Sequence, residues 1–264
     1  TVKIMVDGIV ENRSAALHLP YLCGAAGADA GSTFLDPDEL IDAVAAVDGA
    51  GFAAHLHAIG DRAVTDALDA IAAVLGIGAP PDGGSAGTPG GRRRHHIAHL
   101  QLVAPQDIPR FAALGVTANL QMLWAAEDDQ VRDLCRPLLG DDRVDRQYPF
   151  ASLLATGAPL VTGSDWPVST PAVVDQIQVG VTRRPVDHPD RPPLAIEQAL
   201  TVDAAVRAAT VGGGRLHGRD VRLRPGARAD LVALDRDIYR IPAEEIASAE
   251  VITTVAGGTV VHRR

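Results

Sequence analysis

Three side chains that can bind metal ions lie at the ends of apolar stretches typical of β-strands. His57 and His99 each end such a stretch, and Asp165 follows Val161-Thr162-Gly163-Ser164 at the end of a third. Imidazole nitrogen and carboxylate oxygen are ligands that zinc and other first-row divalent metals prefer. Side chains at the carboxyl ends of parallel strands converge even when they are far apart in sequence, as in a (β/α)8 barrel. The pattern predicts a metal site, and the alternative is a set of hydrogen-bonded core or rim residues.

Strand-like and helix-like patterns alternate along the regions that must position these residues. The expected strands are Val2–Val6, Gly51–His57, His95–Leu100, Val116–Leu120 and Ala158–Thr162. The expected helices are 37–47, preceded by Asp36 as its N-cap, one that begins at Asp61, and 105–114, 149–155, 171–180 and 196–211. Strands that alternate with helices predict βα units and a parallel sheet, in a barrel or in an open doubly wound fold.

The sequence after Gly218 changes to short strands and turns. The expected strands are Val221–Leu223, Ala229–Leu234, Val251–Ala256 and Thr259–His262, with turns at Pro225-Gly226 and Gly257-Gly258. We therefore expect residues 218–264 to form a small β module that follows an α/β part of residues 1–217. The segment 79–91 is rich in proline and glycine, which predicts a surface loop.

The composition excludes several functional classes. The chain has 264 residues and a net charge of −9, which argues against a general nucleic-acid binder. No apolar run is long enough to cross a membrane, and no secretory signal is visible. Two cysteines, Cys23 and Cys135, do not suggest a disulfide framework and fit a reducing compartment, so a cytoplasmic protein is expected.

One lysine stands among many arginines. The chain has 24 basic residues, and all except Lys3 are arginine. Such a bias is typical of a GC-rich genome, which replaces lysine wherever arginine serves. A lysine that persists offers a neutral, nucleophilic amine that arginine cannot supply. Chance is the alternative explanation for a single lysine.

Five stretches form a recognisable series along the chain: VKI and DG within residues 2–8, HAIGDRA at 57–63, HLQLV at 99–103, GSDWPV at 163–168 and PGARADLVALD at 225–235. Together they resemble the YtcJ-like branch of the metal-dependent amidohydrolase superfamily. Their order and spacing agree over almost the whole chain, although each piece alone is unspecific. The resemblance implies a partial (β/α)8 TIM barrel containing about strands 4–8, followed by a small portion of a C-terminal β-sandwich.

The resemblance also implies roles for the candidate ligands. Lys3 would lie on the fourth barrel strand as a carbamylated lysine that bridges two metals. His57 and His99 would be the ligands of the fifth and sixth strands. Asp165 would bind metal from the eighth strand and take a proton from the attacking water. One or two divalent ions, expected to be zinc, would activate that water and polarise the substrate carbonyl.

Further expectations concern contact with the substrate and a second histidine on the same strand. Trp166, Trp124 and Gln121 are expected to contact the substrate, and ordinary packing is an equal alternative for Trp124. His55 lies two residues before His57 and on the same side of the strand, which imitates a His-x-His metal motif. We interpret His55 as a supporting or packing residue, because the sequence that follows favours the fifth strand.

Three more side chains are given structural interpretations. His95 and His96 follow three arginines and are expected at a solvated strand entry, and Asp61 is expected to cap its helix. The family has Arg-Ile-Glu-His on the sixth strand where this chain has His96-Ile97-Ala98-His99. That difference removes a carboxylate that would support His99.

The preferred function is a metal-dependent amidohydrolase that cleaves a C–N amide or N-acyl bond of a small molecule by metal-activated water. A complete barrel needs eight βα units in about 250 residues, and this chain offers about five, with no first-strand His-x-His. We therefore expect the C-terminal part of a longer enzyme, partnered by the missing N-terminal half, and we keep a homodimer as an option.

Two other functions stay open at this point. One is a catalytically inactive barrel fragment that serves binding or regulation. The other is an unrelated, smaller α/β hydrolase, which the absence of a Gly-x-Ser-x-Gly motif disfavours.

Overall fold

The computed structural model describes residues 1–22, 29–76 and 94–264. The predicted loop at 79–91 and Cys23 lie outside the described residues. The chain divides into two compact units, of which the first comprises residues 1–120 and 129–160 and the second residues 121–128 and 161–264. The boundary expected between residues 217 and 218 stays a prediction.

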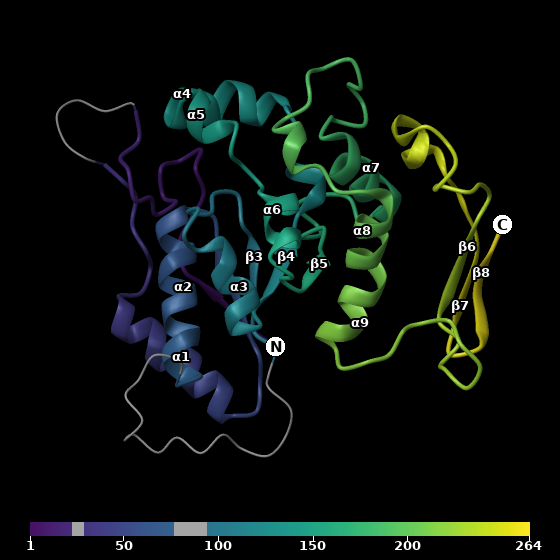
Figure 1. Ribbon diagram of the computed structural model, residues 1–264, viewed down its shortest axis with the longest axis horizontal. Coiled ribbons are helices and arrows are strands. Elements are labelled where there is room, and N and C mark those ends of the chain that lie inside the picture. Colours follow the sequence, from purple (N-terminus) through teal and green to yellow (C-terminus); the bar gives the residue numbers. More distant parts are fainter. Residues whose placement is uncertain (23–28, 77–93) are drawn as a thin grey trace. The chain divides into compact units, whose positions relative to one another are not determined.

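A parallel sheet lies at the centre of the first unit (Figure 1). Its strands are β1 (Val2–Met5), β2 (Ala54–Ala58), β3 (His96–His99), β4 (Thr117–Leu120) and β5 (Leu160–Thr162), which begins in this unit, and they follow one another in chain order. The first four pair in parallel, residue by residue. The prediction of an α/β fold with a parallel sheet is confirmed. Membership of this sheet in a partial barrel stays a prediction.

Helices connect these strands. They are α1 (Pro37–Gly49), α2 (Asp61–Val74), α3 (Ile108–Leu114), the π-helix η2 (Val131–Cys135), α4 (Arg136–Leu139), α5 (Asp141–Val144) and α6 (Phe150–Ala155). Asp36 and Glu39 form a capping box at the start of α1, which confirms the predicted N-cap. The helical segments between Val131 and Val144 are absent from the sequence prediction.

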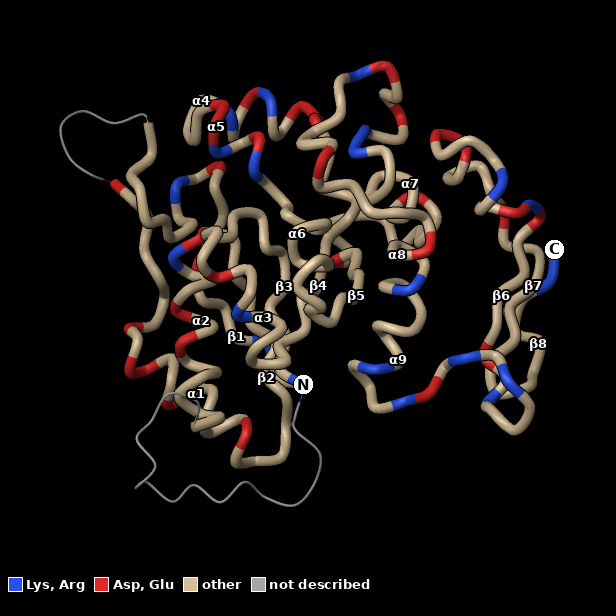
Figure 2. Tube along the Cα trace, in the orientation of Figure 1, with Lys and Arg blue, Asp and Glu red and all other residues tan. Residues whose placement is uncertain are grey.

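The sheet has one apolar face and one polar face. Leu56, Ile97 and Ala118 lie in register on adjacent strands and are fully buried. The helices α1, α2 and α3 lie together on one side of the sheet (Figure 1), and α2 contacts β2. Side chains alternate between the two faces of a strand, so the neighbours of these apolar residues lie on the opposite face. Figure 2 shows that β3 and β4 carry no acidic, lysine or arginine residues, so the polar face is built from other side chains.

The second unit contains short helices and an antiparallel sheet. Its elements are the 3-10 helix η1 (Met122–Trp124), α7 (Val173–Thr182), the 3-10 helix η3 (Ile196–Gln198), α8 (Val202–Arg207), the π-helix η4 (Ala208–Gly212), α9 (Gly213–Leu216), β6 (Leu231–Leu234), the 3-10 helix η5 (Ala243–Ser248), β7 (Val251–Ala256) and β8 (Thr259–Arg263). The strand order is β6-β7-β8, and Gly257 and Gly258 turn between the last two with positive φ. The predicted β module forms, although its place in a sandwich stays a prediction.

Two predicted elements of this unit are wrong. The single helix expected over 196–211 is interrupted, because Ala199 is extended and the Thr201 side chain caps a new helix by accepting from the Ala204 amide. The strand expected at Val221–Leu223 does not form. None of the helices within the described ranges is long and apolar enough to cross a membrane.

Candidate functional site

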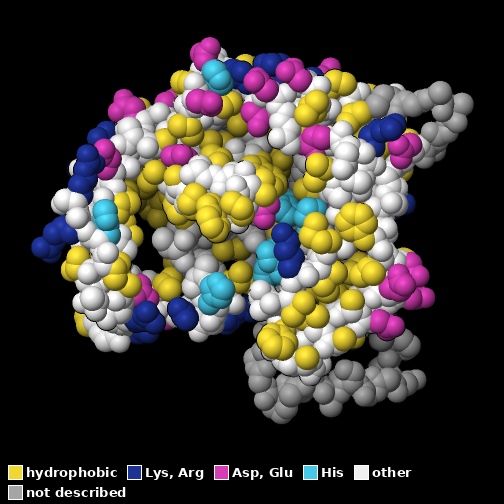
Figure 3. Space-filling model, turned by 180° about the vertical axis from the view of Figure 1, so that it is seen from behind, with side chains coloured by type: hydrophobic (Ala, Val, Ile, Leu, Met, Phe, Trp, Pro, Cys, Tyr) yellow, Lys and Arg dark blue, Asp and Glu magenta, His cyan; other side chains and the backbone are white. Residues whose placement is uncertain are grey.

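A row of basic side chains crosses the polar face of the sheet. Lys3 on β1 pairs with His55 on β2, and His55 pairs with His96 on β3. Residues in register on neighbouring strands share a face, so these side chains lie in one row. The ring centroids of His55 and His96 are 4.4 Å apart. Figure 3 shows several histidine side chains side by side next to a cationic side chain on one face of the molecule.

His57 lies two residues beyond His55 on the same face, near the carboxyl end of β2. Its ring is buried, with 6% of the residue exposed, and its Nε2 is 3.1 Å from the carbonyl oxygen of Gly8. In a neutral ring, Nε2–H donates to that carbonyl and Nδ1 carries the lone pair. Metal-binding histidines are commonly oriented by such a bond from the second ring nitrogen.

His99 reaches His57 only because its backbone departs from the strand conformation. It pairs with Ala58, so strand alternation would direct its side chain to the opposite face from His57. The φ angles of His99 and Leu100 are 80° and 55°, however, and the His99 ring lies edge-on to the His57 ring with centroids 4.3 Å apart. Such backbone costs roughly 1–3 kcal/mol per residue and clusters at functional sites.

Burial favours the neutral forms of His96 and His99. Burial is the largest cause that lowers the pKa of His99, and His57, Lys3 and His55 add to it. Burial and His55 likewise lower the pKa of His96 to about 4. A neutral imidazole is the form that coordinates a metal ion, so His99 is available as a ligand at neutral pH.

Asp7 holds the loops next to this pair, and the sequence interpretation gave it no role. Its fully buried carboxylate accepts hydrogen bonds from the backbone amides of Ala16 (2.9 Å), Ile59 (3.0 Å) and Gly60 (2.8 Å). One carboxylate oxygen lies 3.8 Å from Nε2 of His57. The only local signal is an Asp-Gly pair after a strand, which is equally typical of a turn.

The structural interpretations of His95, His96 and Asp61 need correction. His95 and His96 are buried, with 2% of each exposed, and do not form a solvated strand entry. Nδ1 of His95 accepts from the Ala54 amide at the start of β2, which explains its burial. Asp61 is the first residue of α2 and does not cap it, because Gly60 occupies the N-cap position.

Asn119 is a further polar residue of this face. It pairs with Ala98, which pairs with His57, so the Asn119 side chain lies on the polar face of the sheet, as His57 does. Asn119 is 9% exposed, and its buried Oδ1 has no hydrogen-bond partner within the described chain. Buried polar atoms without a partner are rare and call for a functional explanation.

Four other predicted site residues belong to the second unit. Asp165 lies three residues beyond the end of β5 with a φ of 53°, and Trp166 next to it is 69% exposed. Gln121 is buried, and its Oε1 has no hydrogen-bond partner among the residues described. Trp124 is partly buried in η1. Contact of these residues with a substrate stays a prediction.

The helix α7 anchors both segments that carry these residues. Thr162, at the end of β5, donates through Oγ1 to Oε1 of Gln176 at 3.0 Å. The helix η1 packs on α7 at Gly180, where an added Cβ would lie 2.6 Å from Sδ of Met122. The absence of a side chain at Gly180 thus permits the close approach that fixes the segment containing Gln121 and Trp124.

The residues of the first unit fit part of a metal-binding set. His57 and His99 present two neighbouring imidazoles, and Lys3 lies on the same face. Within residues 1–22, 29–76 and 94–264, no group of three or more His, Cys, Asp or Glu side chains is arranged to hold a metal ion. The assignment of His57, His99 and Lys3 as metal ligands stays a prediction.

Comparison with known proteins identifies the family. The sequence model of the Amidohydrolase family matches residues 1–262. The chain belongs to the amidohydrolase family. It is 30% identical over 263 residues to "Protein LONG AFTER FAR-RED 3" of Arabidopsis thaliana, covering 97% of this chain and 42% of that protein. It is 26% identical over 267 residues to "Putative amidohydrolase YtcJ" of Bacillus subtilis, covering 100% of this chain and 47% of that protein.

A solved structure agrees with this assignment. An uncharacterized metal-dependent hydrolase from Pyrococcus horikoshii OT3 superposes with a TM-score of 0.73 at 25% identity, over 92% of this chain and 45% of that one. The predicted resemblance to YtcJ-like amidohydrolases is confirmed. This amidohydrolase chain spans about half the length of the curated relatives that it matches.

Proposed function

We propose that this chain forms part of a metal-dependent amidohydrolase that cleaves a C–N amide or N-acyl bond of a small molecule. The observation that carries the proposal is the ring contact of His57 and His99 at the carboxyl ends of adjacent parallel strands. The left-handed backbone at His99 supports it, because only that departure from strand geometry brings the two imidazoles together. Family membership supplies the class of reaction.

Each ligand candidate has a defined part in this proposal. Nδ1 of His57 would bind the ion while Gly8 fixes the ring through Nε2, and His99 would bind through a neighbouring imidazole. Lys3 would contribute as a carbamate, which requires its amine to be neutral when it reacts with carbon dioxide. Asp165 would be a further ligand and would accept a proton from water. A bound divalent ion, for which zinc suits these nitrogen and oxygen ligands, supplies Lewis acidity.

A complete metal site needs ligands beyond those named above. The matched relatives are about twice the length of this chain, so we propose that the missing N-terminal half contributes them. A cytoplasmic location and a homodimer stay predictions.

Metal analysis of histidine variants tests the proposal directly. We expect near-stoichiometric divalent metal in the purified protein, measured by inductively coupled plasma mass spectrometry, and a loss of at least tenfold in metal affinity in His57→Ala and in His99→Ala. His188→Ala is the matched control, because His188 is an exposed histidine outside the proposed site. Hydrolysis of a chromogenic N-acyl aniline should fall in parallel with the metal content.

Two results would argue against this function. Metal binding that is unchanged in His57→Ala and His99→Ala would remove both histidines from the site. A folded protein that binds no metal and hydrolyses no N-acyl aniline, even when joined with the N-terminal half, would favour the alternative of a non-catalytic binding or regulatory module.

A further inference from the structure

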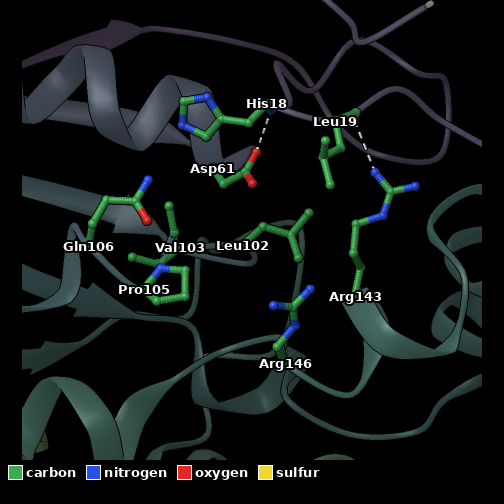
Figure 4. A pocket seen from close by; sticks show the side chains of 10 residues that line it. His18, Leu19, Asp61, Leu102, Val103, Pro105, Gln106, Arg143 and Arg146 are labelled. Atoms are coloured by element: carbon green, nitrogen blue, oxygen red, sulfur yellow. Dashed lines mark hydrogen bonds between the residues drawn. The ribbon is translucent and has the colours of Figure 1, made fainter.

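A cavity lies in the first unit, and none of the expected metal ligands lines it. The cavity has a volume of about 240 Å³, and ten residues line it: His18, Leu19, Asp61, Leu102, Val103, Ala104, Pro105, Gln106, Arg143 and Arg146 (Figure 4). They come from the loops that follow β1 and β3, from the first residue of α2, and from α5 and the segment after it. The lining thus combines acidic, basic and apolar side chains.

Charges of opposite sign face the cavity from different walls. Figure 4 shows the Asp61 carboxylate and the Arg146 guanidinium directed toward the space between them, with Arg143 beside it. Both arginines donate to backbone carbonyls and Asp61 accepts from backbone amides, so within the described residues neither arginine forms an ion pair with Asp61. A ligand that carries both an anionic and a cationic group would therefore satisfy both walls at once.

Hydrogen bonds hold these charged groups in place before any ligand binds. Oδ1 of Asp61 accepts from the backbone amides of His18 (2.9 Å) and Arg62 (3.0 Å). Nε of Arg146 donates to the Asp142 carbonyl at 2.8 Å. That bond leaves the two Nη groups of Arg146 to make the paired contact that a carboxylate prefers. Pre-positioned groups lower the entropy cost of binding.

The second arginine anchors the wall. Arg143 donates through Nε to the Leu139 carbonyl at 2.7 Å and through Nη1 to the Leu19 carbonyl at 3.0 Å. Its positive charge favours an anion, while its hydrogen bonds keep the α5 segment against the loop that carries Leu19. Removal of Arg143 would alter the fold, so it is unsuitable as a test position.

The rest of the lining limits the size and nature of the ligand. Leu102 is buried, and Val103 and Pro105 add an apolar surface next to the charged walls. A volume of 240 Å³ corresponds to about eight water molecules, which is close to the size of a free amino acid. We propose that this cavity binds a small zwitterion of the α-amino acid class, with its carboxylate on Arg146, its ammonium on Asp61 and its apolar side chain against Leu102 and Val103.

Isothermal titration calorimetry with three probes tests this site. The probes are L-leucine, isopentylamine, which lacks the carboxylate, and 4-methylpentanoate, which lacks the ammonium. Leucine should bind at least tenfold more tightly than either analogue, because each analogue leaves one wall without a partner. Equal binding of 4-methylpentanoate and leucine would overturn the proposal in favour of a simple anion site. Absence of saturable leucine binding up to about 20 mM would also overturn it.

Variants decide whether this cavity is the binding site. Arg146→Gln removes the charge, Val103→Phe fills the cavity without a change of charge, and each should weaken leucine binding at least tenfold. Arg132→Gln is the matched control, because Arg132 is an exposed arginine that does not line the cavity. If Arg146→Gln unfolds, Val103→Phe gives the deciding result. Leucine binding that persists in folded Val103→Phe or Arg146→Gln would exclude this cavity. The metal content is expected to be the same in all these proteins, so the outcome is separate from that of the proposed hydrolase function.

Discussion

Asp7 is expected to be a major determinant of the stability of the first unit. Its carboxylate is fully buried and accepts three backbone hydrogen bonds, from Ala16, Ile59 and Gly60. These amides belong to two separate loops, in which they have no partner in a helix or strand. The Asp7 side chain accepts their hydrogen bonds instead. Substitution of Asp7 by alanine would leave three buried N–H groups without an acceptor.

The expected loss follows from the number of unpaired groups. A buried donor without a partner costs about 1–3 kcal/mol, and local rearrangement reduces the sum. We expect Asp7→Ala to lower the free energy of unfolding by about 3–5 kcal/mol, a large fraction of the total stability of an ordinary domain. Asp7→Asn retains one acceptor oxygen, so its loss at neutral pH should be smaller.

Burial of Asp7 also makes the free energy of unfolding depend on pH. Burial raises the pKa of Asp7 from 3.8 to about 6, although the three amides and Arg62 oppose that change. Between these two values the folded protein binds more protons than the unfolded chain. Stability from this group is therefore present in full below pH 3.8 and falls as the pH rises to about 6, by about 3 kcal/mol in total. Asp7→Asn does not titrate and lacks this decrease.

Urea unfolding of the wild type and of Asp7→Asn at several pH values measures the effect. The difference between the two proteins should shift in favour of Asp7→Asn by about 2 kcal/mol from pH 4 to pH 7, which is most of the total change, because other titrating groups are common to both and cancel. The exposed variant Asp187→Asn provides the control. A difference that does not change with pH, or a loss below about 1 kcal/mol in Asp7→Ala, would refute the reasoning.

Three more outcomes are expected. Burial and His55 lower the pKa of His96 from 6.5 to about 4, so the contribution of His96 to stability should fall by about 3 kcal/mol on acidification across that range, and in urea titrations the difference between the wild type and His96→Gln should shift in favour of His96→Gln by that amount. Gly180→Ala should cost about 1–3 kcal/mol through contact with Met122, and a double-mutant cycle with Met122→Ala should show the coupling. Asn119→Leu should raise stability by about 1 kcal/mol in thermal unfolding, with reduced hydrolysis if the amide contacts substrate.

Local patterns in the sequence were sufficient to locate the strands of the first unit. The apolar runs that predicted β2, β3 and β4 contain the fully buried residues Leu56, Ile97 and Ala118, and this burial is why the runs could be recognised, whereas β1 is mostly exposed and was located by its apolar sequence alone. Contacts between residues far apart in the sequence could not be predicted in this way. Three arginines before His95 suggested solvent, but that side chain accepts a hydrogen bond from Ala54, which lies 41 residues away. The break at Ala199 was missed because helical periodicity continues across it, although Thr201 is a typical N-cap residue.

The contact between His57 and His99 shows why the site itself was only partly predictable. Strand alternation would place the His99 side chain on the face opposite to His57. The left-handed backbone that turns it toward His57 is held by two long-range hydrogen bonds, in which the N–H groups of Leu100 and Leu102 donate to the carbonyls of Ala58 and Ile59. Ile59 also donates its own N–H to Asp7, so Asp7 is linked through one residue to the turn that aims His99.

This link gives a last prediction, which separates a positioning role of Asp7 from a purely structural one. In folded Asp7→Asn, the ¹⁵N chemical shifts of the His57 and His99 rings should both change, because the one remaining acceptor oxygen cannot hold both loops as the carboxylate does. The ring of His95, bonded to Ala54 at the amino end of β2, should not respond. A change confined to His57 would contradict the positioning role. It would show that Asp7 affects only the ring that lies 3.8 Å from its carboxylate and has no effect on His99 through Ile59.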